Sequence, residues 1–238
     1  MCTVTYIPTL TGDYTFTSNR DEAPKRSAAQ ITSEDIYGKT LLYPKDEESS
    51  GSWIIISDTN QLVCILNGAF IRHERKLPYR LSRGIMAKEF FSYDNAETFI
   101  AQFDFDGIEP FTMIIVDQGV LYELKWDSTK LHIKKPERTQ MHLWASSTLY
   151  DDELQHKRQQ WFKEWKDKTM CMNQECILSF HKNGGEGNPQ SDVVMNYKDI
   201  VKTTSITSVT SDHGSFEMRF ESLENQEVAN RTMQKTTS

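Results

Sequence analysis

The sequence predicts an α+β fold with largely antiparallel sheets. Strand-like stretches come in pairs joined by short turns, at residues 2–7 and 14–18, 53–56 and 62–66, and 202–210 and 215–222. Helix-like stretches are grouped in other parts of the chain and do not alternate with single strands. Such grouping favours antiparallel hairpins over a parallel sheet with crossover helices.

The first strands follow from side-chain alternation. Residues 2–7 and 14–18 alternate apolar with small or polar side chains on either side of a turn at Gly12-Asp13, which predicts the first hairpin. Residues 23–50 are polar and are predicted to form a surface excursion with a strand inside. The second hairpin ends at Asn67-Gly68.

The helices follow from apolar spacing and capping residues. Apolar residues recur at helical spacing over 79–91, and Asp94 is expected to cap a second helix through Phe103. Strands are then expected at 111–117, 119–126 and 130–134, and another ending in 144–148. Two more helices are predicted, one capped by Asp151 and reaching about Trp165, and one over 173–182. A glycine-rich loop follows at 182–191.

Length and composition indicate one globular domain. The chain has 238 residues, of which 37% are hydrophobic and 11% aromatic, so a sizeable core is expected over residues 1–238. The polar tail is expected to fray from about residue 224. The formal net charge of −7 argues against a general nucleic-acid partner.

The sequence also predicts a cytoplasmic location. No run approaches the roughly 18 apolar residues of a transmembrane segment, and the first residues lack the pattern of a signal peptide. Four cysteines over this length are too few for a disulfide scaffold, which suggests a reducing compartment. Cys171, Cys176 and His181 lie five residues apart, which on a helix does not bring them to one face, so no metal site and no cofactor are predicted.

Cys2 is the first candidate for chemistry. If Met1 is removed, Cys2 carries a thiol and a free α-amine, with reference pKa values of about 8.5 and about 7.7–8. A nucleophile with a base on the same residue is one solution for covalent catalysis. The alternative interpretation is a small apolar residue that opens an edge strand.

A run of polar residues at the end of the second strand is the second candidate. Ser18, Asn19, Arg20, Asp21 and Glu22 return towards residue 2 through the hairpin. A carboxylate there can orient an α-ammonium group, and a guanidinium favours a thiolate. The alternative is a charged turn whose residues pair with one another.

These motifs resemble the NRDE family, also called the transport and Golgi organisation 2 family, which is named for Asn19-Arg20-Asp21-Glu22. The similarity continues through Gly51-Ser52-Trp53, through Cys64 to Gly68, and more weakly through Trp144 to Tyr150. The family resembles the N-terminal nucleophile hydrolases, among them choloylglycine hydrolases and penicillin V acylases. The resemblance therefore implies a four-layer αββα sandwich of two antiparallel sheets flanked by helices.

The resemblance also implies roles for individual residues. Cys2 attacks an amide carbonyl, Asp21 holds the Cys2 amine and thiol, Asn67 contributes to the oxyanion hole, and Asn19 and Arg20 complete the catalytic set. The predicted substrate-binding residues are Ser18, Gly68, Ser146, Ser147 and Arg83. Ser18 stands where the acylases carry an arginine, and Ser147 where they carry an asparagine. Arg83, with Tyr79 and Arg80, supplies positive charge at the pocket mouth or belongs to a solvated helix face.

The sequence thus favours a cysteine N-terminal nucleophile hydrolase that cleaves a non-peptide C–N bond of a small molecule. The alternative implied by the family is a non-catalytic protein that binds or carries haem, lipid or acyl-CoA in the same pocket.

Overall fold

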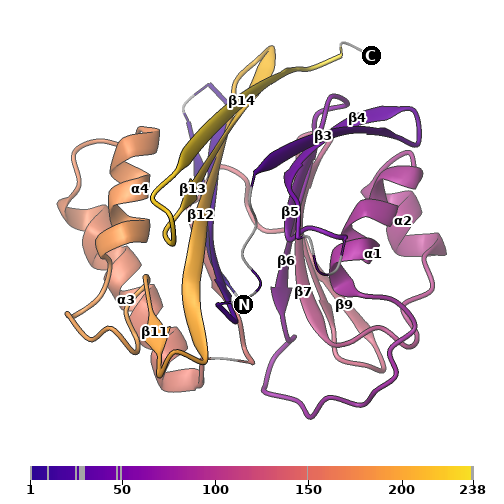
Figure 1. Ribbon diagram of the computed structural model, residues 1–238. Coiled ribbons are helices and arrows are strands. Elements are labelled where there is room, and N and C mark those ends of the chain that lie inside the picture. The colour runs from indigo at the N-terminus through magenta and orange to yellow at the C-terminus, as the bar shows by residue number, and fades with distance from the viewer. Residues whose placement is uncertain are drawn as a thin grey trace.

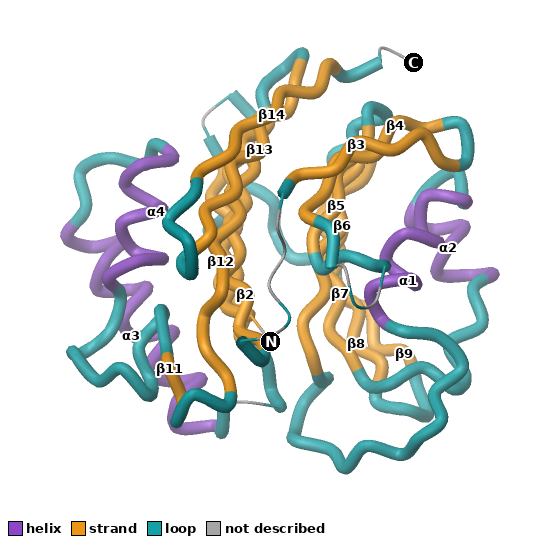
Figure 2. Tube along the Cα trace, viewed as in Figure 1, coloured by secondary structure: helices purple, strands orange, loops and turns teal. Residues whose placement is uncertain are grey.

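The computed structural model describes residues 2–9, 11–24, 26, 30–46, 48, 50–148 and 150–236, and of Cys2 it describes the backbone. In this part of the chain two antiparallel sheets stack face to face, with helices on both outer faces (Figure 1). Figure 2 shows the same order of layers, helix, sheet, sheet, helix. The α+β prediction and the αββα sandwich are confirmed.

The first sheet holds both candidate segments. Its strands follow the order β10 (His142–Ala145), β1 (Cys2–Pro8), β2 (Tyr14–Glu22), β12 (Val201–Ser211), β13 (Ser215–Ser222) and β14 (Val228–Gln234), with β11 (Asn196–Tyr197) paired to β12. The hairpin register places Cys2 opposite Arg20, and Thr203 of β12 lies opposite Asp21. A register shift between Thr203 and Ser205 accompanies this pairing.

The second sheet is a meander in chain order. Its strands are β3 (Ile31–Ile36), β4 (Lys39–Pro44), β5 (Ile54–Ser57), β6 (Gln61–Asn67), β7 (Phe111–Asp117), β8 (Val120–Trp126) and β9 (Leu131–Lys134). Neighbouring strands are antiparallel and need no crossover, and the long connection from β6 to β7, residues 68–110, carries the helices that cover this sheet. The excursion expected at 23–50 therefore contributes two strands rather than one.

Helices cover the outer faces. α1 (Arg83–Glu89), a 3₁₀ turn (Phe90–Ser92) and α2 (Ala96–Gln102) lie on the second sheet, and α3 (Asp152–Lys168) and α4 (Gln174–Asn183) lie on the first (Figure 1). Asp151 caps α3 as predicted, by accepting a bond from the Leu154 amide. α2 is capped by Asn95 rather than Asp94, because it is the Asn95 side chain that accepts from the Thr98 amide.

Three apolar layers hold these elements together. One lies between the sheets and includes Val4, Phe16 and Ile54. A second joins α1 and α2 to the second sheet, and a third joins α3 and α4 to the first sheet. Alternate residues of β2 consequently face different layers. This alternation decides to which side of the sheet each polar side chain at the end of β2 can point.

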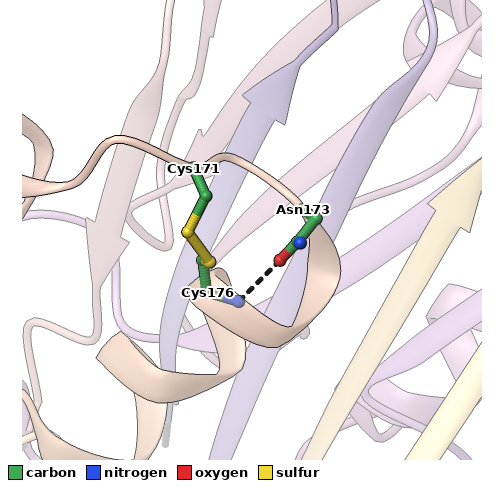
Figure 3. The surroundings of a disulfide bond; sticks show 3 residues. All are labelled: Cys171, Asn173 and Cys176. Atoms are coloured by element: carbon green, nitrogen blue, oxygen red, sulfur yellow. Dashed lines mark hydrogen bonds between the residues drawn. A yellow bond between two sulfur atoms is a disulfide. The ribbon is translucent and has the colours of Figure 1, made fainter.

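Two expectations fail. The tail that was predicted to fray from about residue 224 contains β14, which pairs with β13 over seven residue pairs. Cys171 and Cys176 form a disulfide, with Cα atoms 6.2 Å apart (Figure 3). The helical spacing argument did not apply because α4 begins at Gln174, after Cys171.

None of the helices in the described ranges is long and apolar enough to cross a membrane.

Candidate functional site

The alternation of β2 divides the polar segment between two faces of the sheet. Arg20 and Glu22 line a cavity, whereas the Asn19 and Asp21 side chains bond to groups on the side of α3 and α4. Ser18 is fully buried opposite Thr207 of β12, and its hydroxyl has no partner among the described residues. The side chains of this one segment therefore point to both faces of the first sheet.

Asp21 is a fully buried carboxylate with donors at both oxygens. Thr203 Oγ1 donates to Oδ1 at 2.6 Å, and the Tyr150 hydroxyl donates to Oδ2 in a short hydrogen bond. Burial raises the pKa of Asp21, while the nearby Arg158 guanidinium and the two hydrogen bonds act to lower it. Tyr150 also lines the cavity, so Asp21 lies directly behind the cavity wall.

Arg158 is a fully buried cation beneath this pair. Its guanidinium carbon lies 3.9 Å from the centroid of the Tyr150 ring. It donates to Thr3 Oγ1 at 3.0 Å and to the carbonyl oxygens of Ser191 and Asp192 at 3.0 and 2.9 Å. Arg158 therefore fixes the Tyr150 ring, β1 and the loop before β11 relative to one another.

Asn19 belongs to a separate buried network. Its amide donates to the carbonyl oxygens of His181 and Val193 at 3.0 and 3.1 Å, and its oxygen accepts from His181 Nδ1. Thr5 Oγ1 lies 2.8 Å from His181 Nε2, and burial, with Arg158 nearby, lowers the pKa of His181 to about 3. The imidazole is therefore neutral. The Asn19 side chain holds α4 against the first sheet and does not line the cavity.

A cavity of about 1230 Å³ opens at the end of the sandwich where β2 and β6 finish. Arg20, Trp53, Asn67, Arg83 and Tyr150 line it. It therefore receives side chains from both sheets, from α1 and from the segment before α3. A volume above the usual range of roughly 300–1,000 Å³ leaves room for more than a small fragment.

Arg20 is held in a fixed place on the cavity wall. Its guanidinium donates to Asp46 Oδ2 at 2.7 Å and to the Arg26 carbonyl oxygen. The guanidinium carbon lies 4.5 Å from the centroid of the Trp53 ring, and Arg20 is only 3% exposed. The Arg20–Asp46 ion pair joins the first sheet to the segment after β4. Arg20 therefore has a structural role and also lines the cavity.

Asn67 and the two serines lie together because two loops pack closely. Ser146 Oγ donates to the Asn67 carbonyl oxygen at 2.6 Å. Gly68 has φ of 81°, and a Cβ there would clash with Ser147 Oγ and the Thr148 side chain. Ser147 Oγ is buried without a partner among the described residues. Glycine is thus required for the segment after β10 to reach the end of β6.

Arg83 stands across the cavity at the start of α1. It donates to the Pro110 carbonyl oxygen at 3.1 Å and pairs with Glu109 at 3.1 Å. Burial lowers its pKa, and the Glu109 carboxylate opposes this shift. Tyr79 lines the same cavity, whereas Arg80 points to the carbonyl oxygens of Asp104 and Asp106.

The predicted nucleophile is only partly described. The Cys2 backbone pairs with Arg20, next to Asp21 along β2. The Cys2 side chain and Met1 lie outside the described residues. Among the residues that are described, no group of three or more histidine, cysteine, aspartate or glutamate side chains is arranged to hold a metal ion.

Residues 1–225 match a family model described as Transport and Golgi organisation 2. The chain belongs to this family. Curated proteins gave no match.

Three solved structures share the fold of this chain. Two variants of the conjugated bile acid hydrolase from Clostridium perfringens, an arginine-to-leucine and a cysteine-to-alanine variant, each have 10% identity and a TM-score of 0.54. The matches cover 100% of this chain and 98% and 97% of those chains. The N-acylethanolamine-hydrolyzing acid amidase ortholog of Caenorhabditis elegans has 8% identity and a TM-score of 0.54, over 87% of this chain and 92% of that one. At such identity the likeness establishes the N-terminal nucleophile hydrolase fold alone.

Sequence reasoning missed three residues around Asp21: Tyr150, Arg158 and Thr203. Tyr150 ends a stretch that already resembled the family. Arg158 shares the buried face of α3 with Trp161 and Phe162, at spacings of three and four residues. This spacing was a usable signal for a buried arginine, whereas the approach of Thr203 depends on strand order and had none.

Proposed function

We propose that this member of the family is a cysteine N-terminal nucleophile hydrolase that cleaves a non-peptide C–N bond of a small molecule. The observation that carries the proposal is the buried Asp21 carboxylate, which lies beside the residue opposite Cys2 and behind the wall of a large cavity. A buried carboxylate next to the strand position opposite Cys2 is suited to orient an α-amine.

The proposed reaction has two steps on one sulfur. The Cys2 sulfur bonds to the amide carbonyl carbon while the thiol proton passes to the free α-amine. The C–N bond then breaks, and the same amine delivers the proton to the departing nitrogen. Water next attacks the thioester, which releases a carboxylic acid and restores the thiol. Asp21 holds the α-amine in place through both steps.

Asn67 is the proposed source of oxyanion stabilisation. It is half-buried at the end of β6 and lines the cavity. Its carbonyl oxygen is held by Ser146, which fixes the backbone from which the side chain projects. Removing one such donor typically costs about 2.7–4 kcal/mol of transition-state stabilisation.

Arg20 and Arg83 define the proposed substrate end of the cavity. Both guanidinium groups already pair with carboxylates, Asp46 and Glu109. Because each guanidinium is paired with a carboxylate, this part of the wall is polar but carries little net charge, which suits a neutral polar substrate group better than an anionic one. Ser18 in place of an arginine indicates that the substrate differs from those of the acylases.

Thiol labelling tests the nucleophile directly. Cys64 is fully buried, and Cys171 and Cys176 form a disulfide, so a mild alkylating reagent applied to the native protein should modify Cys2 first. Intact mass first establishes that Met1 is absent. Asp21→Asn should slow the labelling, and Cys64→Ala, the matched control, should leave it unchanged. Labelling of Cys2 no faster than that of a free cysteine peptide would sink the mechanism.

A substrate screen then separates hydrolase from carrier. N-acyl amino acids, lactams and acyl thioesters are incubated with wild type and with Cys2→Ser, and products are read by mass spectrometry. Turnover that Cys2→Ser abolishes supports the hydrolase. Saturable binding of haem or acyl-CoA that is equal in both proteins, with no turnover, supports the carrier instead.

A further inference from the structure

Exposed apolar side chains gather at the mouth of the cavity. Among the described residues, nine large hydrophobic side chains are exposed, and five of them lie on two segments at this end. Phe70, Ile71 and Leu77 belong to the loop between β6 and α1, and Tyr197 and Ile200 lie between β11 and β12. The loop between β6 and α1 extends past the strand ends, at the same end of the sandwich as β11 (Figures 1 and 2).

These segments form the rim of the cavity itself. Leu77, Tyr197 and Ile200 line the cavity, and Ile71 and Leu77 are 75% and 70% exposed. Side chains of this kind are costly to leave in water, and single ones are common on surfaces. Three at one opening, with Phe70 and Ile71 further along the same loop, constitute a patch that calls for a partner.

The loop between β6 and α1 is also basic in an acidic protein. Residues 69–82 contain four arginines and lysines against one glutamate, whereas the whole chain has a net charge of −7. Arg75 pairs with Glu109 at 3.4 Å and Arg80 with Asp104 at 3.6 Å. Within the described ranges the Arg72 and Lys76 side chains form no ion pair, so their charges face solvent.

We propose that residues 70–77 and 197–200, together called the rim, dock this protein on an anionic lipid bilayer. Apolar side chains enter the boundary between headgroups and acyl chains, and the neighbouring cations meet the lipid phosphates. A bilayer offers both chemistries across one continuous plane, which suits apolar residues on two separate loops. The acidic residues Asp151 and Glu153 also line the cavity, so the basic loop makes the first contact.

Docking in this orientation joins the cavity to the membrane. An amphiphile can then leave the bilayer and enter the opening with less exposure of its apolar part to water. This inference does not depend on catalysis, since a carrier and a hydrolase would both use such an entrance.

Vesicle flotation tests the rim. The full chain is mixed with vesicles of phosphatidylcholine alone or with about 30% phosphatidylserine, at low and high salt. Wild type should float with the anionic vesicles, and less so as salt rises. Arg72→Gln with Lys76→Gln should weaken partitioning about 30-fold, from a factor of about five per cation. Ile71→Ser with Leu77→Ser should weaken it at least tenfold.

The control variant carries the same type of change elsewhere. Met170 and Val228 are exposed apolar residues away from the rim, and Met170→Ser with Val228→Ser should float like wild type. Absence of flotation with anionic vesicles overturns the proposal, as does equal flotation by the rim and control variants. Light scattering that shows a dimer, converted to monomer by Ile71→Ser with Leu77→Ser, also overturns it, because the rim would then cover a second copy.

Discussion

Tyr150→Phe tests the hydroxyl contacts at the centre of the candidate site, namely the short hydrogen bond to Asp21 and a weaker one to Met195 Sδ at 3.5 Å. The change removes the hydroxyl that donates to Asp21 and keeps the ring that covers Arg158. Thr203 remains as a donor to the other carboxylate oxygen. The variant therefore changes the environment of one buried carboxylate while the packing of α3 stays intact.

The expected loss in the free energy of unfolding follows from the charge of the acceptor, the Asp21 carboxylate. A hydrogen bond to a charged group contributes about 1.5–3 kcal/mol to stability. For a chain of this size each kcal/mol corresponds to a fall in Tm of about 2–4 °C. The loss should depend on pH, because the hydroxyl acts to lower the pKa of Asp21 and its removal raises that pKa further.

The direction of this dependence is fixed. A carboxyl group whose pKa is raised in the folded state stabilises the fold fully below its unfolded pKa, and this contribution disappears as pH rises through the folded pKa. Tyr150→Phe should therefore cost most where Asp21 is ionised, and its cost should shrink on acidification as Asp21 takes up a proton.

Urea unfolding between about pH 5 and about pH 8 measures this difference. Tyr122→Phe is the matched control, since Tyr122 is also buried but its hydroxyl bonds at 3.4 Å to Glu97, an exposed carboxylate. The control should lose less than about 1 kcal/mol at every pH. Equal losses in the two variants, or a loss for Tyr150→Phe that does not change with pH, would refute the reasoning.

Three further predictions concern the frame of the site. Gly68→Ala should lower stability by about 2–4 kcal/mol in urea unfolding, because positive φ and a clash with Ser147 and Thr148 both act against the methyl group; an unchanged midpoint would contradict the close approach. Reduction of the Cys171–Cys176 disulfide should lower the free energy of unfolding by about 2 kcal/mol. A variant with serine at both positions should not respond to reductant. Isolation of the protein with both thiols free would contradict the disulfide and favour the predicted cytoplasmic location. Arg20→Met should cost about 1.5–3 kcal/mol, the contribution of hydrogen bonds to a charged group, because Asp46 keeps its ion pair with Arg26; a loss under about 0.5 kcal/mol would show that the Arg20–Asp46 pair does not hold the two layers together.

The fold was accessible from the sequence because its elements are local. The alternation before and after Gly12-Asp13 identifies the first hairpin, and Asp151 marks the start of α3 with a single capping side chain. β14 was not accessible in this way. Its residues are mostly polar and exposed, and it is a strand because β13 offers it an unpaired edge.

The sequence by itself determined the fold class, the family and the segment around Asp21, since each depends on residues that are neighbours along the chain. It also placed Asn67-Gly68 at the end of a strand. The tertiary structure alone decided which face each residue of that segment serves, because alternation along β2 sends Arg20 to the cavity and Asn19 to α4. It alone brought Tyr150, Arg158 and Thr203 to Asp21, because those contacts join residues more than a hundred positions apart, and only strand order and helix packing set such distances.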